Sequence, residues 1–228
     1  MSPLKTMTKS SLASWEAIYS DNKHLSVWPW TDVVSLTKRF ARLQPAARVL
    51  ELGCGAGANI PFFQSLGVEY WGIEGSASIV THVREAYPDI ADRLVVGDFS
   101  KEIAAPGYFD LIVDRGSITH NSTSGIRRIL EMVKGKLAPQ GVLLGVDWFS
   151  TEFSEYRSGQ PGEDEFTRIN FTNGRLSGTG LAHFCDEPHL RNLLSAFAID
   201  FLEHKTQRQV IPAGGGTYAA WNLVARPA

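Results

Sequence analysis

The sequence has only two cysteines, Cys54 and Cys185, and they lie far apart in the chain. Neither belongs to a C-x-x-C pair, so we expect neither a disulfide framework nor a zinc site, and a reducing compartment fits. No apolar run approaches the length that spans a bilayer. Residues 1–14 carry lysines but no apolar core, unlike a signal peptide. These absences predict a soluble cytoplasmic protein with no membrane partner.

An excess of charge of one sign is also missing. The 22 Lys and Arg residues nearly balance 24 Asp and Glu residues, which gives a formal net charge of −2. Nucleic-acid-binding domains usually carry a basic patch, so we expect no nucleic-acid partner. The 228 residues, of which 43% are hydrophobic and 20% charged, suffice for one α/β domain with a substantial core.

Glycine, by contrast, is concentrated at one informative place. The apolar run Val49-Leu50-Glu51-Leu52 leads directly into Gly53-Cys54-Gly55-Ala56-Gly57, and a helical pattern begins at Ala58. This order predicts a buried parallel strand, a tight turn and a helix. Glycines in such a turn let the backbone approach a ligand closely. In doubly wound sheets the first strand-to-helix turn is where nucleotide-like ligands bind.

Two details distinguish this turn from a dinucleotide-binding loop. The spacing is G-x-G-x-G rather than G-x-G-x-x-G, and the carboxylate of Glu51 precedes Gly53 by two residues. That acid would repel a pyrophosphate but would attract a cation. The segment resembles motif I of the class I S-adenosylmethionine-dependent methyltransferases, whose cofactor carries a sulfonium, an amino group and no phosphate. The resemblance implies that this cofactor's methionine end is held by Glu51, Gly53, Cys54, Gly55 and Gly57.

Two further acids follow predicted strands, and the resemblance gives them roles in cofactor binding. Glu74, with Gly75 and Ser76 after it, would accept hydrogen bonds from the ribose hydroxyls. Asp98, within Gly97-Asp98-Phe99, would accept from the adenine amine while Phe99 lies beside the ring. The alternatives are a surface acid in a glycine-rich turn for Glu74 and a helix N-cap for Asp98.

Asp114 and Arg115 end another predicted strand at the position of the family's motif IV. The resemblance places both next to the cofactor's sulfonium, and Asp114 is therefore also a candidate catalytic residue. The sequence is not the Asp/Asn-Pro-Pro-Tyr of enzymes that methylate exocyclic amines of nucleic acid bases or glutamine amides. Catechol-type relatives hold Mg²⁺ with acids after two strands and an adjacent Asn. Asp114 and Asp147 could supply such acids, but Trp148 follows Asp147, and we expect no metal.

Two histidines are candidates for a catalytic base. His120 comes just after motif IV and before a helix, at the edge of the sheet where a methyl acceptor should lie. His183 precedes another helix at the same edge. A hydroxyl acceptor needs its proton removed near neutral pH, and histidine is the usual base for this step. The alternative is that each histidine only orders its own loop.

The chain alternates strands and helices, which predicts a parallel sheet. Strands are predicted at 48–52, 69–73, 94–96, 109–113, 142–146, 199–204 and 218–225. Helices are predicted at 12–19, 31–43, 58–66, 77–86, 122–137 and 187–197. The fold class is therefore α/β, a doubly wound, mostly parallel seven-stranded sheet. Its antiparallel terminal hairpin resembles that of class I methyltransferases and is lacking in NAD-binding Rossmann domains.

The domain organisation follows from where this alternation holds. We expect residues 1–45 to form an N-terminal helical cap over the acceptor site and residues 46–228 to form the Rossmann-like domain. Residues 148–180 are polar and weakly patterned but contain aromatics, which indicates a lid-like insertion.

The function predicted from these features is methyl transfer from S-adenosylmethionine to an oxygen or nitrogen of a small molecule, a sugar or other small metabolite being the candidates. The protein would yield S-adenosylhomocysteine, and a homodimer is compatible with the sequence. The alternatives are a nicotinamide-dependent oxidoreductase and a non-catalytic partner protein that binds the cofactor.

Overall fold

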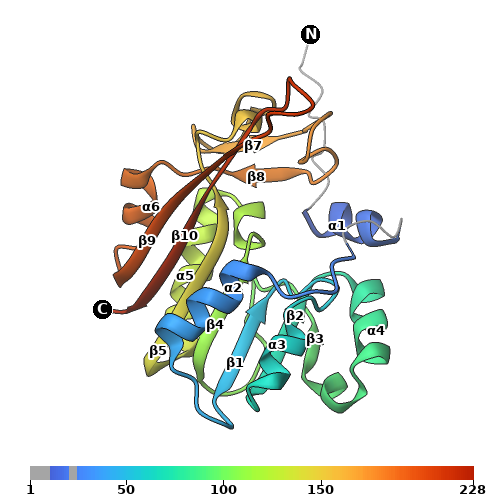
Figure 1. Ribbon diagram of the computed structural model, residues 1–228, viewed down its shortest axis with the longest axis vertical. Coiled ribbons are helices and arrows are strands. Elements are labelled where there is room, and N and C mark those ends of the chain that lie inside the picture. Colours follow the sequence, from blue (N-terminus) through green and yellow to red (C-terminus); the bar gives the residue numbers. More distant parts are fainter. Residues whose placement is uncertain (1–10, 21–24) are drawn as a thin grey trace.

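A computed structural model describes residues 11–20 and 25–228, so parts of the expected N-terminal cap (1–10 and 21–24) lie outside the described residues. A seven-stranded sheet forms the centre of the molecule (Figure 1). Across the sheet its strands are β3 (Leu94–Val96), β2 (Glu69–Glu74), β1 (Arg48–Leu52), β4 (Phe109–Arg115), β5 (Leu137–Phe149), β10 (Thr217–Pro227) and β9 (Phe197–Arg208). Strands β1 to β5 pair in parallel, whereas β10 is antiparallel to both neighbours. The predicted fold class is confirmed.

Strand order explains why the candidate site residues come together. β1 lies between β2 and β4, and Leu52 is in register with Ile73 on one side and Asp114 on the other. The carboxyl ends of these strands therefore meet at one edge of the sheet. Their interior positions are almost all buried, as expected for parallel strands covered on both faces.

Helices cover both faces of the sheet. One face packs α2 (Thr31–Leu36), α3 (Ile60–Ser65) and α4 (Ala77–Ala86) on alternate strand residues such as Val49. The other face packs α5 (Thr123–Lys136) and α6 (Glu187–Leu193) on residues such as Leu50. Side chains cap three of these helices: Ser76, Ser122 and Asp186 accept from the backbone of the first turn. Within the described residues, no helix has the length and apolar character needed to cross a membrane.

Element boundaries differ from the predictions in several places, and three of these differences are instructive. The helix predicted to reach residue 43 is α2 followed by a π-helical segment, Thr37–Ala41, and it ends at Arg42 in a left-handed conformation. Helix α6 stops at Leu193, short of residue 197. Strand β5 begins at Leu137, earlier than expected, because Leu137 already pairs with Phe109 before the irregularity around Pro139.

The segment predicted as a lid contains regular structure of its own. A second, antiparallel sheet consists of β6 (Gln160–Pro161), β7 (Thr167–Ile169) and β8 (Leu181–His183). It encloses a separate aromatic core with the start of β10, and Figure 1 shows β9 and β10 extending upward to reach this layer. Strands of two or three residues are too short to show alternation, which is why the sequence did not predict them.

Candidate active site

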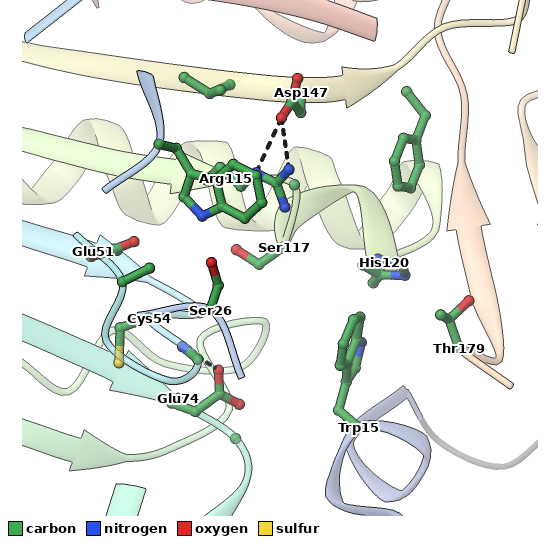
Figure 2. A pocket seen from close by; sticks show the side chains of 18 of the residues that line it. Trp15, Ser26, Glu51, Cys54, Glu74, Arg115, Ser117, His120, Asp147 and Thr179 are labelled. Atoms are coloured by element: carbon green, nitrogen blue, oxygen red, sulfur yellow. Dashed lines mark hydrogen bonds and ion pairs between the residues drawn. The ribbon is translucent and has the colours of Figure 1, made fainter. Parts of the chain in front are cut away.

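A cavity of about 1370 Å³ opens where the carboxyl ends of β1, β2, β4 and β5 meet. Helix α1 (Ser11–Ser20) lies over one side of it and the second sheet over the other (Figure 1). Figure 2 shows side chains from all these elements around the same space. The fold therefore brings most of the predicted residues together.

The glycine loop after β1 forms part of the cavity wall. Gly53 and Gly55 have φ of 66° and 51°, a left-handed conformation that is costly for residues with a Cβ. A Cβ on Gly53 would lie 2.4 Å from the Cβ of Ser117, and one on Gly55 would lie 2.8 Å from the Tyr19 hydroxyl. Gly53, Cys54 and Gly55 line the cavity, while Gly57 shapes the turn behind it.

Glu51 is a buried carboxyl group on the cavity wall, only 3% exposed. Its two oxygens accept hydrogen bonds from Tyr70 Oη and Asn59 Nδ2, each at 2.7 Å. Burial raises the pKa of Glu51 to about 7, with hydrogen bonds from Tyr70 and Asn59 opposing the shift. A buried acid of this kind is more stable as a carboxylate when a cation lies beside it. This environment fits the sulfonium or ammonium of the cofactor that the sequence predicts.

Glu74 links the two turns that flank the cavity. Its Oε2 accepts from Gly55 N at 3.1 Å and its Oε1 from Ser76 N at 3.0 Å. Each oxygen retains further acceptor capacity for a hydroxyl donor, because a carboxylate has about four acceptor sites. Gly75 also lines the cavity, whereas Ser76 caps α4.

Asp98 orders the turn after β3 and does not cap a helix, and its contact with the adenine amine stays a prediction. Its Oδ1 accepts from Ser100 N at 3.1 Å, and Lys101 Nζ lies 2.9 Å from its Oδ2, so it orders the following turn. Asp98 and Phe99 also line the cavity; Gly97 does not.

Asp114 does not line the cavity and instead points into the protein. The side chain is fully buried, and it accepts from Trp148 Nε1 at 2.7 Å and Ile118 N at 2.9 Å. Burial raises its pKa to about 6. The structure therefore does not support the predicted ligand contact or catalytic role. Asp114 is a positioning residue for Trp148 and for the turn that carries Ser117, a hydroxyl group on the cavity wall.

Arg115 belongs to a chain of alternating charges along the cavity. Arg115 NH2 lies 2.9 Å from Asp147 Oδ2 (Figure 2). Lys205 Nζ lies 2.8 Å from Asp147 Oδ1 and also contacts Asp32. The guanidinium of Arg115 lies 3.6 Å from the centre of the Trp30 ring. Asp147 is thus paired with two cations and Asp114 is turned away, so these two acids do not point to a common point in the described residues.

His120 faces the cavity from a short 3₁₀ turn, Ile118–His120. Its Nδ1 lies 2.8 Å from the carbonyl oxygen of Leu181 in β8. A carbonyl only accepts, so Nδ1 carries the proton and the basic lone pair belongs to Nε2. The ring packs edge-on between Trp15 and Phe149, with centroid distances of 5.0 and 5.7 Å.

His183 does not reach the cavity. It is fully buried in β8, burial lowers its pKa to about 3, and its Nε2 lies 3.1 Å from His189 Nε2. His183 was predicted to lie at the same sheet edge as His120. Instead it lies in strand β8, which runs behind the cavity wall at this residue. We therefore do not retain His183 as a base.

Several cavity residues were not predicted. They come from distant elements: Trp15, Tyr19, Asp32, Asn59, Ser117, Phe153, Lys205 and Tyr218. Of these, only Phe153 carried a signal in the sequence, as an aromatic residue in the weakly patterned segment 148–180.

Comparison with known proteins agrees with this geometry. Residues 22–204 match a family model described as a methyltransferase domain. The chain belongs to this methyltransferase family. A comparison with curated proteins finds no match.

Solved structures of methyltransferases share the fold of this methyltransferase. An S-adenosylmethionine-dependent methyltransferase from Methanosarcina mazei superposes with a TM-score of 0.67 at 19% identity, covering 88% of this chain and 98% of that one. One from Clostridium acetobutylicum gives 0.62 at 11% identity, covering 94% and 96%. The CcbJ methyltransferase of Streptomyces caelestis gives 0.61 at 16%, covering 86% and 94%.

The cofactor of this methyltransferase is S-adenosylmethionine. The residues present fit it: Glu51 offers a buried anionic partner for a cation, and Gly53 and Gly55 leave no Cβ in the cradle. The nicotinamide-dependent alternative is not retained, because the family match favours methyl transfer.

Proposed function

We propose that the protein methylates an oxygen or nitrogen of a small molecule, with His120 as the general base for a hydroxyl acceptor. The observation that carries the proposal is the 2.8 Å contact of His120 Nδ1 with the Leu181 carbonyl, which assigns the basic lone pair to Nε2 at the cavity. The acceptor would be a sugar or another small metabolite. A homodimer and the absence of a nucleic-acid partner remain predictions.

The size and lining of the cavity support a second ligand beside the cofactor. Small-molecule pockets usually measure about 300–1,000 Å³, and this cavity is larger. Part of the cavity wall is aromatic, with Trp15, Phe149, Phe153 and Tyr218. These rings form an apolar surface on which the carbon skeleton of an acceptor can pack and from which water is excluded.

When bound, the cofactor supplies a methyl group attached to a sulfonium. The neutral thioether that remains after transfer is a good leaving group. The protein then has to hold the acceptor in line, remove water and take one proton. The aromatic wall and the Arg115–Asp147–Lys205–Asp32 charge network would hold the acceptor. His120 Nε2 would receive the hydroxyl proton, and the Leu181 carbonyl would stabilise the resulting imidazolium.

The test is His120→Ala, assayed with an acceptor found by screening metabolite extracts with labelled S-adenosylmethionine. We expect turnover to fall by about 10²–10⁴ with little change in cofactor affinity. The rate of the parent enzyme should rise with pH through one ionisation. His82→Ala is the matched control, since His82 is exposed on α4. Full turnover of His120→Ala would contradict the base and favour an amine or an already ionised acceptor.

A further inference from the structure

Three potential metal ligands lie together behind the cavity wall, on a short stretch of chain. His183 ends β8, Cys185 is two residues later, and His189 is in the first turn of α6. Their ligand atoms all lie within 4.8 Å of one another, and this is the only such group of three among the described residues. The extended backbone from 183 to 185 directs both side chains to one side, and the helix brings His189 back to them.

The distances suit a small tetrahedral ion. The two Nε2 atoms are 3.1 Å apart. Two imidazole nitrogens at Zn–N distances of about 2.0–2.1 Å in a tetrahedron would lie about 3.3 Å apart. A thiolate at about 2.3 Å would lie roughly 3.6 Å from each nitrogen, which a small movement of the Cys185 side chain can provide.

Polar groups behind His183 orient its ring for such a role. Its Nδ1 lies 3.3 Å from Thr123 Oγ1 and 3.4 Å from Thr167 Oγ1. Both hydroxyls donate to the carboxylate of Asp164, so each presents an oxygen lone pair to the ring. Nδ1 therefore donates, and the lone pair of Nε2 points toward His189 and Cys185. Metal-binding histidines typically donate their other ring N–H to an oxygen acceptor, and here Asp164 orients the hydroxyls that accept it.

Acidic side chains lie near the two rings. Four carboxylates act on the histidines in the direction that favours a positive charge: Glu163, Asp164, Glu165 and Asp186. Arg127 and burial act in the opposite direction. His189 is half-buried, which leaves a path for an ion and for water as a fourth ligand.

We propose that His183, Cys185 and His189 bind one Zn²⁺ ion per chain, as a site separate from the methyl-transfer cavity. The expectation of no zinc site rested on the lack of a C-x-x-C pair, whereas the spacing here is H-x-C-x₃-H. The ion would fasten β8 to α6. Because Leu181 of the same strand holds His120, the site would also stabilise the wall that carries the proposed base.

The experiment uses the full chain, freed of any affinity tag, treated with a chelator and titrated with Zn²⁺ and with Co²⁺. We expect one ion per chain by mass spectrometry and a Kd for Zn²⁺ below about 1 µM. With Co²⁺ we expect a near-ultraviolet thiolate-to-metal charge-transfer band. Zn²⁺ should also raise the melting temperature of the chelator-treated protein.

Variants decide which residues bind. Cys185→Ser should abolish the Co²⁺ band, and His189→Asn, at a half-buried position, should weaken Zn²⁺ binding at least about 100-fold, beyond the usual effect of an outer-sphere change. Cys54→Ser is the matched control and should keep both the Co²⁺ band and the affinity for Zn²⁺. Circular dichroism checks that each variant folds. Absence of binding by the parent protein, or binding that His189→Asn leaves unchanged, would overturn the proposal and leave the His183–His189 contact as a hydrogen bond.

Discussion

Protonation of Glu51 should control how tightly the cofactor binds. The group is buried beside the glycine loop with a pKa of about 7, so near neutral pH it is only partly ionised. A cationic ligand stabilises the carboxylate, so binding lowers this pKa and releases a proton. Linkage then requires affinity to rise with pH until Glu51 is ionised in the free protein, and to level off above that point.

We therefore expect the affinity for S-adenosylmethionine to increase between pH 6 and 8, by at most about tenfold per pH unit. Calorimetry in buffers of different ionisation enthalpy would measure both the affinity and the released proton. In Glu51→Gln this pH dependence should disappear. A flat profile in the parent protein would show that Glu51 does not contact the cationic part of the ligand.

The sequence revealed some residues of the site and not others, for a physical reason. Glu51 and Glu74 lie at the carboxyl ends of buried strands and Gly55 follows one, so their position at the sheet edge depends on strand order alone. Asp114 is also at a strand end, but its orientation depends on Trp148, which lies 34 residues later and donates to it. A partner contributed by tertiary packing cannot be inferred from a motif.

At the level of elements, α1 covers the cofactor end of the cavity. Tyr19 lies over Gly55, and Trp15 packs on His120. Such a cover slows both entry and exit of a ligand. We expect Tyr19→Ala to raise both rate constants for S-adenosylhomocysteine by roughly fivefold, since packed aromatic contacts are worth about 1 kcal/mol.

Stopped-flow fluorescence would measure these rate constants, and the dissociation constant should change less than either rate. Trp28→Ala is a suitable control because Trp28 is 77% exposed. Unchanged rates in Tyr19→Ala would indicate that ligands enter from the side of the second sheet.

The long elements were predictable because each carries its own periodicity and caps. All seven strands of the main sheet were predicted, and the bounds of β1 and β3 agree with the structure. The second sheet was not, because β6, β7 and β8 are held by the aromatic core around Phe184 rather than by local pattern. Its position decides where Leu181 meets His120, so the acceptor side of the site could be predicted only in outline.

For the whole molecule, ligand binding should appear as added stability. At one hundred times its dissociation constant, S-adenosylhomocysteine should raise the free energy of unfolding by about 2.7 kcal/mol. For a chain of this size that corresponds to a rise in Tm of roughly 5–10 °C. Differential scanning calorimetry would measure the shift, with NADH as the comparison ligand. A shift with NADH and none with S-adenosylhomocysteine would contradict the assigned cofactor.

The contact between His120 and Leu181 uses a main-chain oxygen, which every amino acid possesses. No single substitution at position 181 deletes that acceptor; only a change in backbone path or chain length would remove it. Residue 181, however, also lines the cavity. A substitution at position 181 can therefore change which acceptor fits the cavity, while His120 keeps the same tautomer. Substrate preference and proton transfer are thus separately adjustable during evolution, even though one residue contributes to both.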